Sequence, residues 1–295
     1  MITAIDTHVH VYDAAAAGLR GRHADEMAAY FRRERRPRSL DEVADFYRER
    51  KMMCVLVNGT DETVTGTRGL PNDYIADAVR THEDVFRGYG AVDPWQGRLA
   101  VAEVTRCLED LGLHGIGELN PARQRFAPND TRFYPIWEEV ARHKKPVLFH
   151  TGMAGAGAGT PGGNGIKLKY GRPIPYLDDL AADIPDLTVI GAHPSWPFTE
   201  DSLAVALHKA NYYIDLSGWA PKYLPASWVT YVNTRLQDKA LFGSDSPNID
   251  VDRWVSEFND LPLKDVVRRK VLLENACRLF GIDPSGRGAS AETSL

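Results

Sequence analysis

Met1-Ile-Thr-Ala-Ile-Asp6-Thr-His8-Val-His10 opens the chain with a short apolar run that ends in two histidines one residue apart. In a β-strand, the side chains of residues i and i+2 point to the same face. We therefore expect His8 and His10 to direct two imidazoles at one point from the end of a strand. The pair alone is weak evidence for a metal site, because the same spacing also occurs in surface and core histidines.

Three later apolar runs also end in a residue whose side chain can bind a metal. Residues 146–150 end at His150, residues 187–193 end at His193, and residues 240–245 end at Asp245. The repetition of this pattern favours a shared site over five unrelated polar residues.

Predicted strands and helices alternate along the whole chain. Most of the strands are continuous apolar runs, as expected of parallel strands that are covered on both faces. A capping-box pattern at residues 39–42 marks the start of one of the helices between them. The eight strands are predicted at residues 2–6, 52–57, 86–92, 115–119, 146–149, 187–192, 212–216 and 240–242. This order predicts an α/β fold, a TIM-like (β/α)8 barrel, with an open doubly wound sheet as the alternative.

Length and composition are compatible with one barrel domain. The chain has 295 residues, of which 43% are hydrophobic and 25% charged, ordinary values for a globular protein. This length admits either two average domains or one barrel. We predict a single domain over residues 1–282, with an inserted helical arm at residues 14–38 after the first strand and a flexible tail at residues 283–295.

Charge and cysteine content restrict the partners. The net charge of -5 argues against nucleic acid as the main partner. No apolar stretch approaches the roughly 18 residues of a membrane-spanning helix. The three cysteines lack metal-binding spacing, which favours reduced thiols. We expect a cytoplasmic protein that acts on a small molecule and binds neither nucleic acid nor membrane.

Two stretches interrupt the regular alternation. The arm at residues 14–38 is rich in arginine, which is typical of a solvated helix or an arm that makes a homo-oligomer, with an anion-binding lid as the alternative. Residues 151–172 are rich in glycine and follow His150. Because long loops at the active-site face are usually functional, we predict that this loop covers the substrate. Its candidate partners for an anionic group are Lys167, Lys169 and Arg172.

The position of the polar residues predicts an active site. Barrel enzymes carry their active sites at the carboxyl ends of the strands. Three or four ligands there would suit one divalent ion, with a position left open for water. Asp245 could also accept a proton from that water, and His193 could act as an acid or base or polarise a carbonyl. The residues at these strand ends are His8, His10, Glu118, His150, His193 and Asp245.

The order of these residues resembles the amidohydrolase superfamily. In detail, the motifs around these residues are similar to those of the amidohydrolase 2 branch of this superfamily, which includes aminocarboxymuconate-semialdehyde decarboxylase. The phrases Ile5-Asp-Thr-His-Val-His10, Ala192-His-Pro194 and Leu241-Phe-Gly-Ser-Asp-Ser-Pro247 carry the likeness, which covers nearly the whole chain. The resemblance implies a distorted barrel with a divalent metal, usually zinc. It implies His193 as the catalytic acid or base and, as metal ligands, His8, His10, His150 and Asp245.

Glu118 departs from this pattern, since many members carry a lysine at the end of strand four. It is similar to the strand-four glutamate of TatD-like metal-dependent hydrolases, which ligates or bridges metals. The resemblance thus implies one ion, or two if Glu118 bridges them. The alternative is that Glu118 orients a ligand histidine.

Two reactions fit this chemistry. We predict a metal-dependent hydrolase, in which a metal-activated water attacks a carbonyl of a small substrate and a C–C, C–O or C–N bond is cleaved. The alternative is nonhydrolytic decarboxylation, which needs an arginine to hold the carboxylate. The negative charge of Glu118 favours hydrolysis. A second alternative is a catalytically silent metal-binding module. The candidate arginines are Arg123, Arg125 and Arg172, and the candidate pocket walls include Trp196 and Trp219.

Overall fold

The computed structural model describes residues 1–32 and 36–284, with the backbone alone for residues 20–26. Neighbouring strands pair in parallel, in one sheet with the order β1-β2-β3 and another with the order β4-β5-β6-β7-β8. The strands are β1 (Ala4–His10), β2 (Met52–Val57), β3 (Phe86–Gly88), β4 (Ile116–Leu119), β5 (Pro146–His150), β6 (Thr188–Ala192), β7 (Tyr212–Asp215) and β8 (Ala240–Leu241).

Backbone hydrogen bonds join the two sheets at both seams. Between β8 and β1, the amide of Thr7 donates to the carbonyl of Phe242 at 2.8 Å. Between β3 and β4, the amide of Gly90 donates to the carbonyl of Gly115 at 2.9 Å. The strands therefore follow one another around a ring in chain order. The predicted TIM-like (β/α)8 barrel is confirmed.

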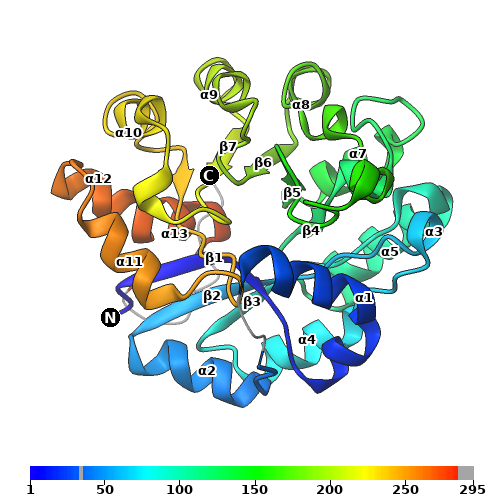
Figure 1. Cartoon of the computed structure of the whole chain (residues 1–295), viewed down its shortest axis with the longest axis horizontal. Helices are drawn as coiled ribbons and strands as arrows, with labels where there is room; N and C mark the ends of the chain where they lie inside the picture. The colour runs from blue at the N-terminus through cyan, green and yellow to red at the C-terminus, as the bar shows by residue number, and fades with distance from the viewer. Residues whose placement is uncertain (33–35, 285–295) are drawn as a thin grey trace.

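Helices surround the strands on the outside (Figure 1). Most of them connect one strand to the next, as the barrel requires. They are α1 (Ala14–Phe31), α2 (Leu40–Glu49), α3 (Glu62–Thr65), α4 (Asn72–Thr81), α5 (Arg98–Thr105), α6 (Pro121–Gln124), α7 (Tyr134–Arg142), α8 (Tyr176–Asp183), α9 (Thr199–His208), α10 (Ala226–Val232), α11 (Val251–Asn259), α12 (Asp265–Arg269) and α13 (Asn275–Phe280). No helix in the described residues is long and apolar enough to cross a membrane.

The packing of β2 explains why the strands are continuous apolar runs. All of its residues are buried. Successive side chains point to opposite faces, and here the two faces belong to different cores. One core fills the interior of the ring and the other lies between the strands and the helices. The two sets are Met53, Val55 and Val57 inside, and Met52, Cys54 and Leu56 outside.

The first strand extends further than the apolar run predicts. β1 continues through both histidines instead of ending at Asp6. Its pairing with β2 shifts register between Asp6 and Val9 and then resumes, with Val9 beside Leu56. The shift keeps β1 hydrogen-bonded up to the rim of the barrel, where His8 and His10 lie.

The inserted arm forms helix α1, which Asp13 caps by accepting a hydrogen bond from the amide of Ala16 at 2.8 Å. Part of the predicted arm, Arg33 and Arg35 included, lies outside the described residues. So does the predicted tail from residue 285 onward.

Candidate metal centre

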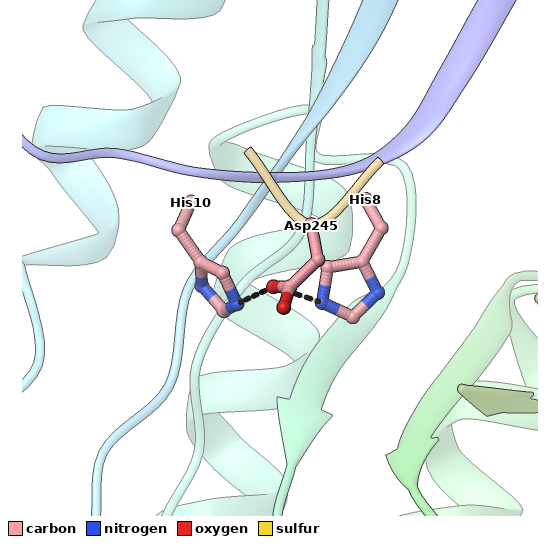
Figure 2. Close-up of side chains that lie close together, drawn as sticks. All are labelled: His8, His10 and Asp245. Atoms are coloured by element: carbon pink, nitrogen blue, oxygen red, sulfur yellow. Dashed lines mark ion pairs between the residues drawn. The ribbon is translucent and has the colours of Figure 1, made fainter. Parts of the chain in front are cut away.

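The side chains of His8, His10 and Asp245 converge at the rim of the barrel (Figure 2). Their ligand atoms all lie within 4.8 Å of one another. His10 Nε2 is 3.0 Å from Asp245 Oδ1, and His8 Nε2 is 3.9 Å from the same oxygen. The amide of Asp245 donates to the carbonyl of His8 at 2.9 Å, so the segment after β8 is held against β1. Residues from opposite ends of the chain thus meet as the sequence predicts.

Two of these ligand atoms are buried without a hydrogen-bond partner among the described residues. They are His8 Nε2 and Asp245 Oδ1, the second of which has an ion-pair contact with His10 Nε2 but no hydrogen bond. An unpaired buried polar group costs about 1–3 kcal/mol, so native proteins rarely leave one unexplained. A cation between the two atoms would satisfy both. Imidazole nitrogen and carboxylate oxygen are also the donors that divalent ions take in catalytic sites. The residues present therefore fit a divalent metal.

Asp215, the last residue of β7, orients His8 from the opposite side. Its Oδ2 lies 2.9 Å from His8 Nδ1, and both side chains are fully buried. Because a carboxylate only accepts, Nδ1 is the donor and Nε2 faces the centre. Burial by itself lowers the pKa of His8, but the Asp215 carboxylate outweighs it and raises the pKa to about 10. A cation that binds at Nε2 must therefore displace a proton.

Glu118 lies between two pairs of histidines. Its Oε1 is 2.8 Å from His150 Nδ1 and 3.3 Å from His193 Nε2. Its Oε2 is 3.8 Å from both His8 Nε2 and His10 Nε2. His8, Glu118 and His193 form a second group with ligand atoms within 4.8 Å. The two oxygens thus face in two directions, as those of a carboxylate that bridges two ions must. The contact with His150 instead suits a carboxylate that orients a ligand histidine.

The charge state of Glu118 follows from its neighbours. Burial by itself raises the pKa of this carboxyl, but His150, His193 and His8 hold it well below its ordinary value. The carboxylate is therefore ionised at neutral pH. His150 uses Nδ1 for this contact, and its Nε2 is buried without a hydrogen-bond partner among the described residues.

A cavity of about 100 Å³ opens beside these side chains, and the five predicted residues His10, Glu118, His150, His193 and Asp245 line it. Two arginines, Arg68 and Arg123, line it as well. Barrel active sites are expected at this end of the strands. The cavity therefore combines a candidate metal centre with cationic side chains.

Both stretches that interrupt the barrel pattern reach this cavity. Met27 of α1 and residues 154–156 of the glycine-rich loop contribute to its lining. At Gly155 an added Cβ would lie 3.0 Å from the Tyr30 ring and 3.3 Å from Met27. The absence of a side chain at this position thus allows α1 to pack closely on the loop.

A family model described as amidohydrolase matches residues 5–282 of this chain. The chain belongs to the amidohydrolase family. This confirms the family to which the motifs around the histidines and Asp245 point.

The relatives of this amidohydrolase include decarboxylases. It is 21% identical over 248 residues to the gamma-resorcylate decarboxylase of Polaromonas sp. (strain JS666). The aligned region covers 72% of this chain and 75% of the relative. Among solved structures it is similar to an uncharacterised TIM-barrel protein from Bordetella bronchiseptica, at 22% identity and a TM-score of 0.77, over 96% of this chain and 99% of the other.

A second similar structure is the dihydroxybenzoic acid decarboxylase from Polaromonas sp. JS666, solved with manganese and the inhibitor 2-nitroresorcinol. Here the identity is 18% and the TM-score 0.64, over 96% of this chain and 98% of the other. At these identities, the likeness to the two structures shows the fold alone.

The residues predicted to contact substrate from the loops lie elsewhere in this amidohydrolase. Arg172 pairs with Asp201 at 3.0 Å and is about half exposed. The Trp196 and Trp219 rings are 6.4 Å apart, with Trp196 46% exposed. None of the predicted loop residues is among the described residues that line the cavity, and their role in substrate binding stays a prediction. The predicted residues that do not line the cavity are Lys167, Lys169, Arg172, Trp196 and Trp219.

Sequence reasoning missed Asp215, Ser217 and Arg68. Asp215 and Ser217 contact site histidines; Asp215 lies near the end of the predicted strand at residues 212–216, and Ser217 directly follows that strand. The strand-end rule that found His150 marks Asp215 as a candidate site residue, but it does not identify His8 as its partner. Arg68 lies in the connection between β2 and α4, where no sequence pattern marks it.

Proposed function

We propose that this amidohydrolase is a metal-dependent decarboxylase of a small aromatic or otherwise unsaturated carboxylic acid. The observation that carries the proposal is that Arg68 and Arg123 line the same cavity as the candidate metal ligands and His193. The decarboxylase activity named for the Polaromonas relative supports the same reaction class. The proposal therefore adopts the alternative that the sequence left open, and hydrolysis becomes the second candidate.

The negative charge of Glu118 favours hydrolysis, because it would repel an acidic substrate. The other charges around the cavity offset this repulsion. The described residues of the lining include three carboxylates, Asp61, Glu118 and Asp245, and two guanidinium groups, Arg68 and Arg123. A single bound divalent ion would change the net charge of these five groups from negative to positive. An anionic substrate is then attracted in spite of Glu118.

A divalent ion held by His8, His10 and Asp245, with Glu118 or His150 as a further ligand, would supply a Lewis acid for the substrate's oxygen atoms. Zinc is the ion expected from the sequence, and manganese is the ion in the Polaromonas structure. The proposal requires only that the ion be divalent.

The protein's own residues supply binding and a proton. Arg123 pairs with Asp61 at 2.7 Å, and its guanidinium has further N–H donors that can hold an anionic group of the substrate. In the reaction, the bond between the carboxyl carbon and the neighbouring carbon breaks, and its electron pair stays on the neighbouring carbon. That carbon takes a proton from the imidazolium form of His193, which becomes neutral, and carbon dioxide leaves. His193 then recovers a proton from water.

A substrate panel tests the proposal. Protein freed of metal and reloaded with manganese or zinc should release carbon dioxide from one or more hydroxybenzoates, and a chelator should stop the release. Stoichiometric formation of the decarboxylated product would be followed by chromatography. Turnover of esters or lactones without any release of carbon dioxide would contradict the proposal and favour hydrolysis.

Hydrolysis has one specific observation in its favour. Asp245 lines the cavity, and its buried Oδ1 makes no hydrogen bond among the described residues beyond its ion-pair contact with His10. Such an oxygen could accept a proton from an attacking water. Product analysis separates the two reactions, and metal binding with no turnover of either panel would favour the silent metal-binding module.

Replacing Arg123 by methionine should raise KM for an acidic substrate about ten- to a hundredfold, the effect of losing one charge-assisted pair. The kcat value should change less, because His193 and the metal ligands stay in place. Steady-state kinetics measures both. Arg172→Met provides the comparison, since Arg172 pairs with Asp201 outside the cavity lining. A larger increase in KM for Arg172→Met than for Arg123→Met would favour the prediction from the sequence that Arg172 of the glycine-rich loop binds the anionic group.

A further inference from the structure

Ser217 lies fully buried between two histidines of the candidate centre. Its Oγ is 2.9 Å from His193 Nδ1 and 3.1 Å from His8 Nδ1. Its amide donates to Asp215 Oδ1 at 2.8 Å. The serine is thus fixed to the same carboxylate that orients His8, and its hydroxyl faces the side of each imidazole that points away from the centre.

The direction of the serine's hydrogen bond follows from its neighbours. His8 Nδ1 donates to Asp215, so it has no lone pair left to accept the Ser217 hydroxyl proton. His193 Nδ1 is the other ring nitrogen in reach. We therefore assign the bond as Ser217 Oγ–H donating to His193 Nδ1, which places the imidazole proton of neutral His193 on Nε2.

The other face of the His193 ring agrees with this assignment. His193 Nε2 lies 3.3 Å from Glu118 Oε1, an ionised oxygen that can only accept. His150 Nδ1 lies 3.0 Å from His193 Nε2, but it is closer to the same Glu118 oxygen, at 2.8 Å, and donates its hydrogen there. In the opposite tautomer, the lone pair of His193 Nε2 would face this carboxylate oxygen, and the contacts of the described residues would offer the Ser217 hydroxyl no ring nitrogen to donate to.

We propose that Ser217 is a positioning residue that holds His193 in the Nε2–H tautomer, with its proton directed towards Glu118 and the cavity. A ring held in this way presents an Nε2–H hydrogen-bond donor and has no Nε2 lone pair for a metal. The arrangement therefore favours one ion over two. The tautomer follows from the contacts alone, whereas its catalytic use rests on the proposed function.

Gly218 provides the space that this contact needs. Its backbone is left-handed, with φ of +73°, and an added Cβ would lie 2.5 Å from His193 Nδ1. A side chain here would push the imidazole away from the Ser217 hydroxyl. The residue after the serine is thus suited to a close approach between this loop and the histidine ring.

Long-range proton–nitrogen NMR of histidine-labelled, metal-free protein reads the tautomer directly, at alkaline pH where the ring is neutral. The His193 signals are assigned by their loss in His193→Gln. We expect the Nε2–H pattern in the natural protein and a shift towards Nδ1–H in Ser217→Ala. An Nδ1–H pattern in the natural protein, or no change in Ser217→Ala, would overturn the proposal. This readout needs no substrate, so it stands or falls separately from the proposed decarboxylation.

A matched pair of variants separates positioning from structure. Ser202→Ala removes another buried hydroxyl, which pairs with Tyr212 at 3.2 Å away from the site histidines, and should leave the His193 spectrum unchanged. Ser217→Cys keeps a weak donor of similar size and should give an intermediate shift, which also covers the case that Ser217→Ala does not fold. A shift in Ser202→Ala as large as that in Ser217→Ala would contradict the specific role.

Metal and turnover measurements complete the test. Ser217→Ala should lower kcat about ten- to a hundredfold, the range typical for loss of a partner that orients a site histidine. Its metal stoichiometry should stay at that of the natural protein, because His193 is not a ligand and Asp215 still orients His8. A loss of bound metal in this variant would show that the serine supports the ligand His8 instead, and would overturn its assignment as a positioning residue of His193.

Discussion

His10→Ala should abolish stoichiometric metal binding and, with it, metal-dependent turnover. His10 Nε2 is the ligand atom nearest to Asp245 Oδ1, at 3.0 Å, and both face the point at which His8 Nε2 lacks a partner. Removing an outer partner of a ligand typically costs ten- to a hundredfold in metal affinity. Loss of a ligand itself should therefore cost at least about a hundredfold. Isothermal titration with zinc and with manganese, backed by elemental analysis, measures the change.

The matched control is His143→Ala. His143 caps α7 and pairs with Glu139, and its side chain is 12% exposed, so it is a partly buried histidine remote from the site. This variant should bind metal like the natural protein. If His10→Ala kept its metal, the ion would belong to the group of His8, Glu118 and His193 instead. The charge balance that supports an anionic substrate would not change, but the ligand set inferred from the first strand would be wrong.

The barrel and the meeting of its two chain ends could be predicted because both follow from short-range rules. Strand periodicity puts His8 and His10 on one face, and two-sided burial makes β2 a continuous apolar run. The barrel architecture then directs the strand ends to one rim. These rules need only the order of residues along the chain, so the candidate ligands at the strand ends could be named from sequence.

The partners behind the ligands were harder to predict. Asp215 reaches His8 across the barrel interior, from a residue 207 positions away along the chain. Such a contact depends on which side chain of β7 points inward and how far it extends, which periodicity does not specify. The same holds for Arg68, whose loop conformation brings it to the cavity. The glycine-rich loop shows the reverse case: its charged residues are prominent in the sequence, yet residues 154–156 are the ones that line the cavity.

His193→Ala should retain bound metal and lose about a hundred- to ten-thousandfold in kcat, the range of general acid catalysis. The reason is geometric. His193 lines the cavity, its Nδ1 is engaged by Ser217, and its Nε2 lies against His150 Nδ1 and Glu118 Oε1. Elemental analysis and single-turnover kinetics on the same preparation give the two numbers.

The metal content and the kcat of His193→Ala together distinguish a centre with one ion from a centre with two. In a binuclear centre, Glu118 would bridge an ion held by His8, His10 and Asp245 to one held by His150 and His193, and His193→Ala would lose about half of the metal. In the mononuclear centre, the metal stays and only the proton donor is lost. Glu118→Gln adds an independent check: it removes the charge but keeps an oxygen acceptor, so His193 can still donate to it. A mononuclear centre with an orienting Glu118 should therefore survive Glu118→Gln with its ion in place, whereas a bridged pair should not.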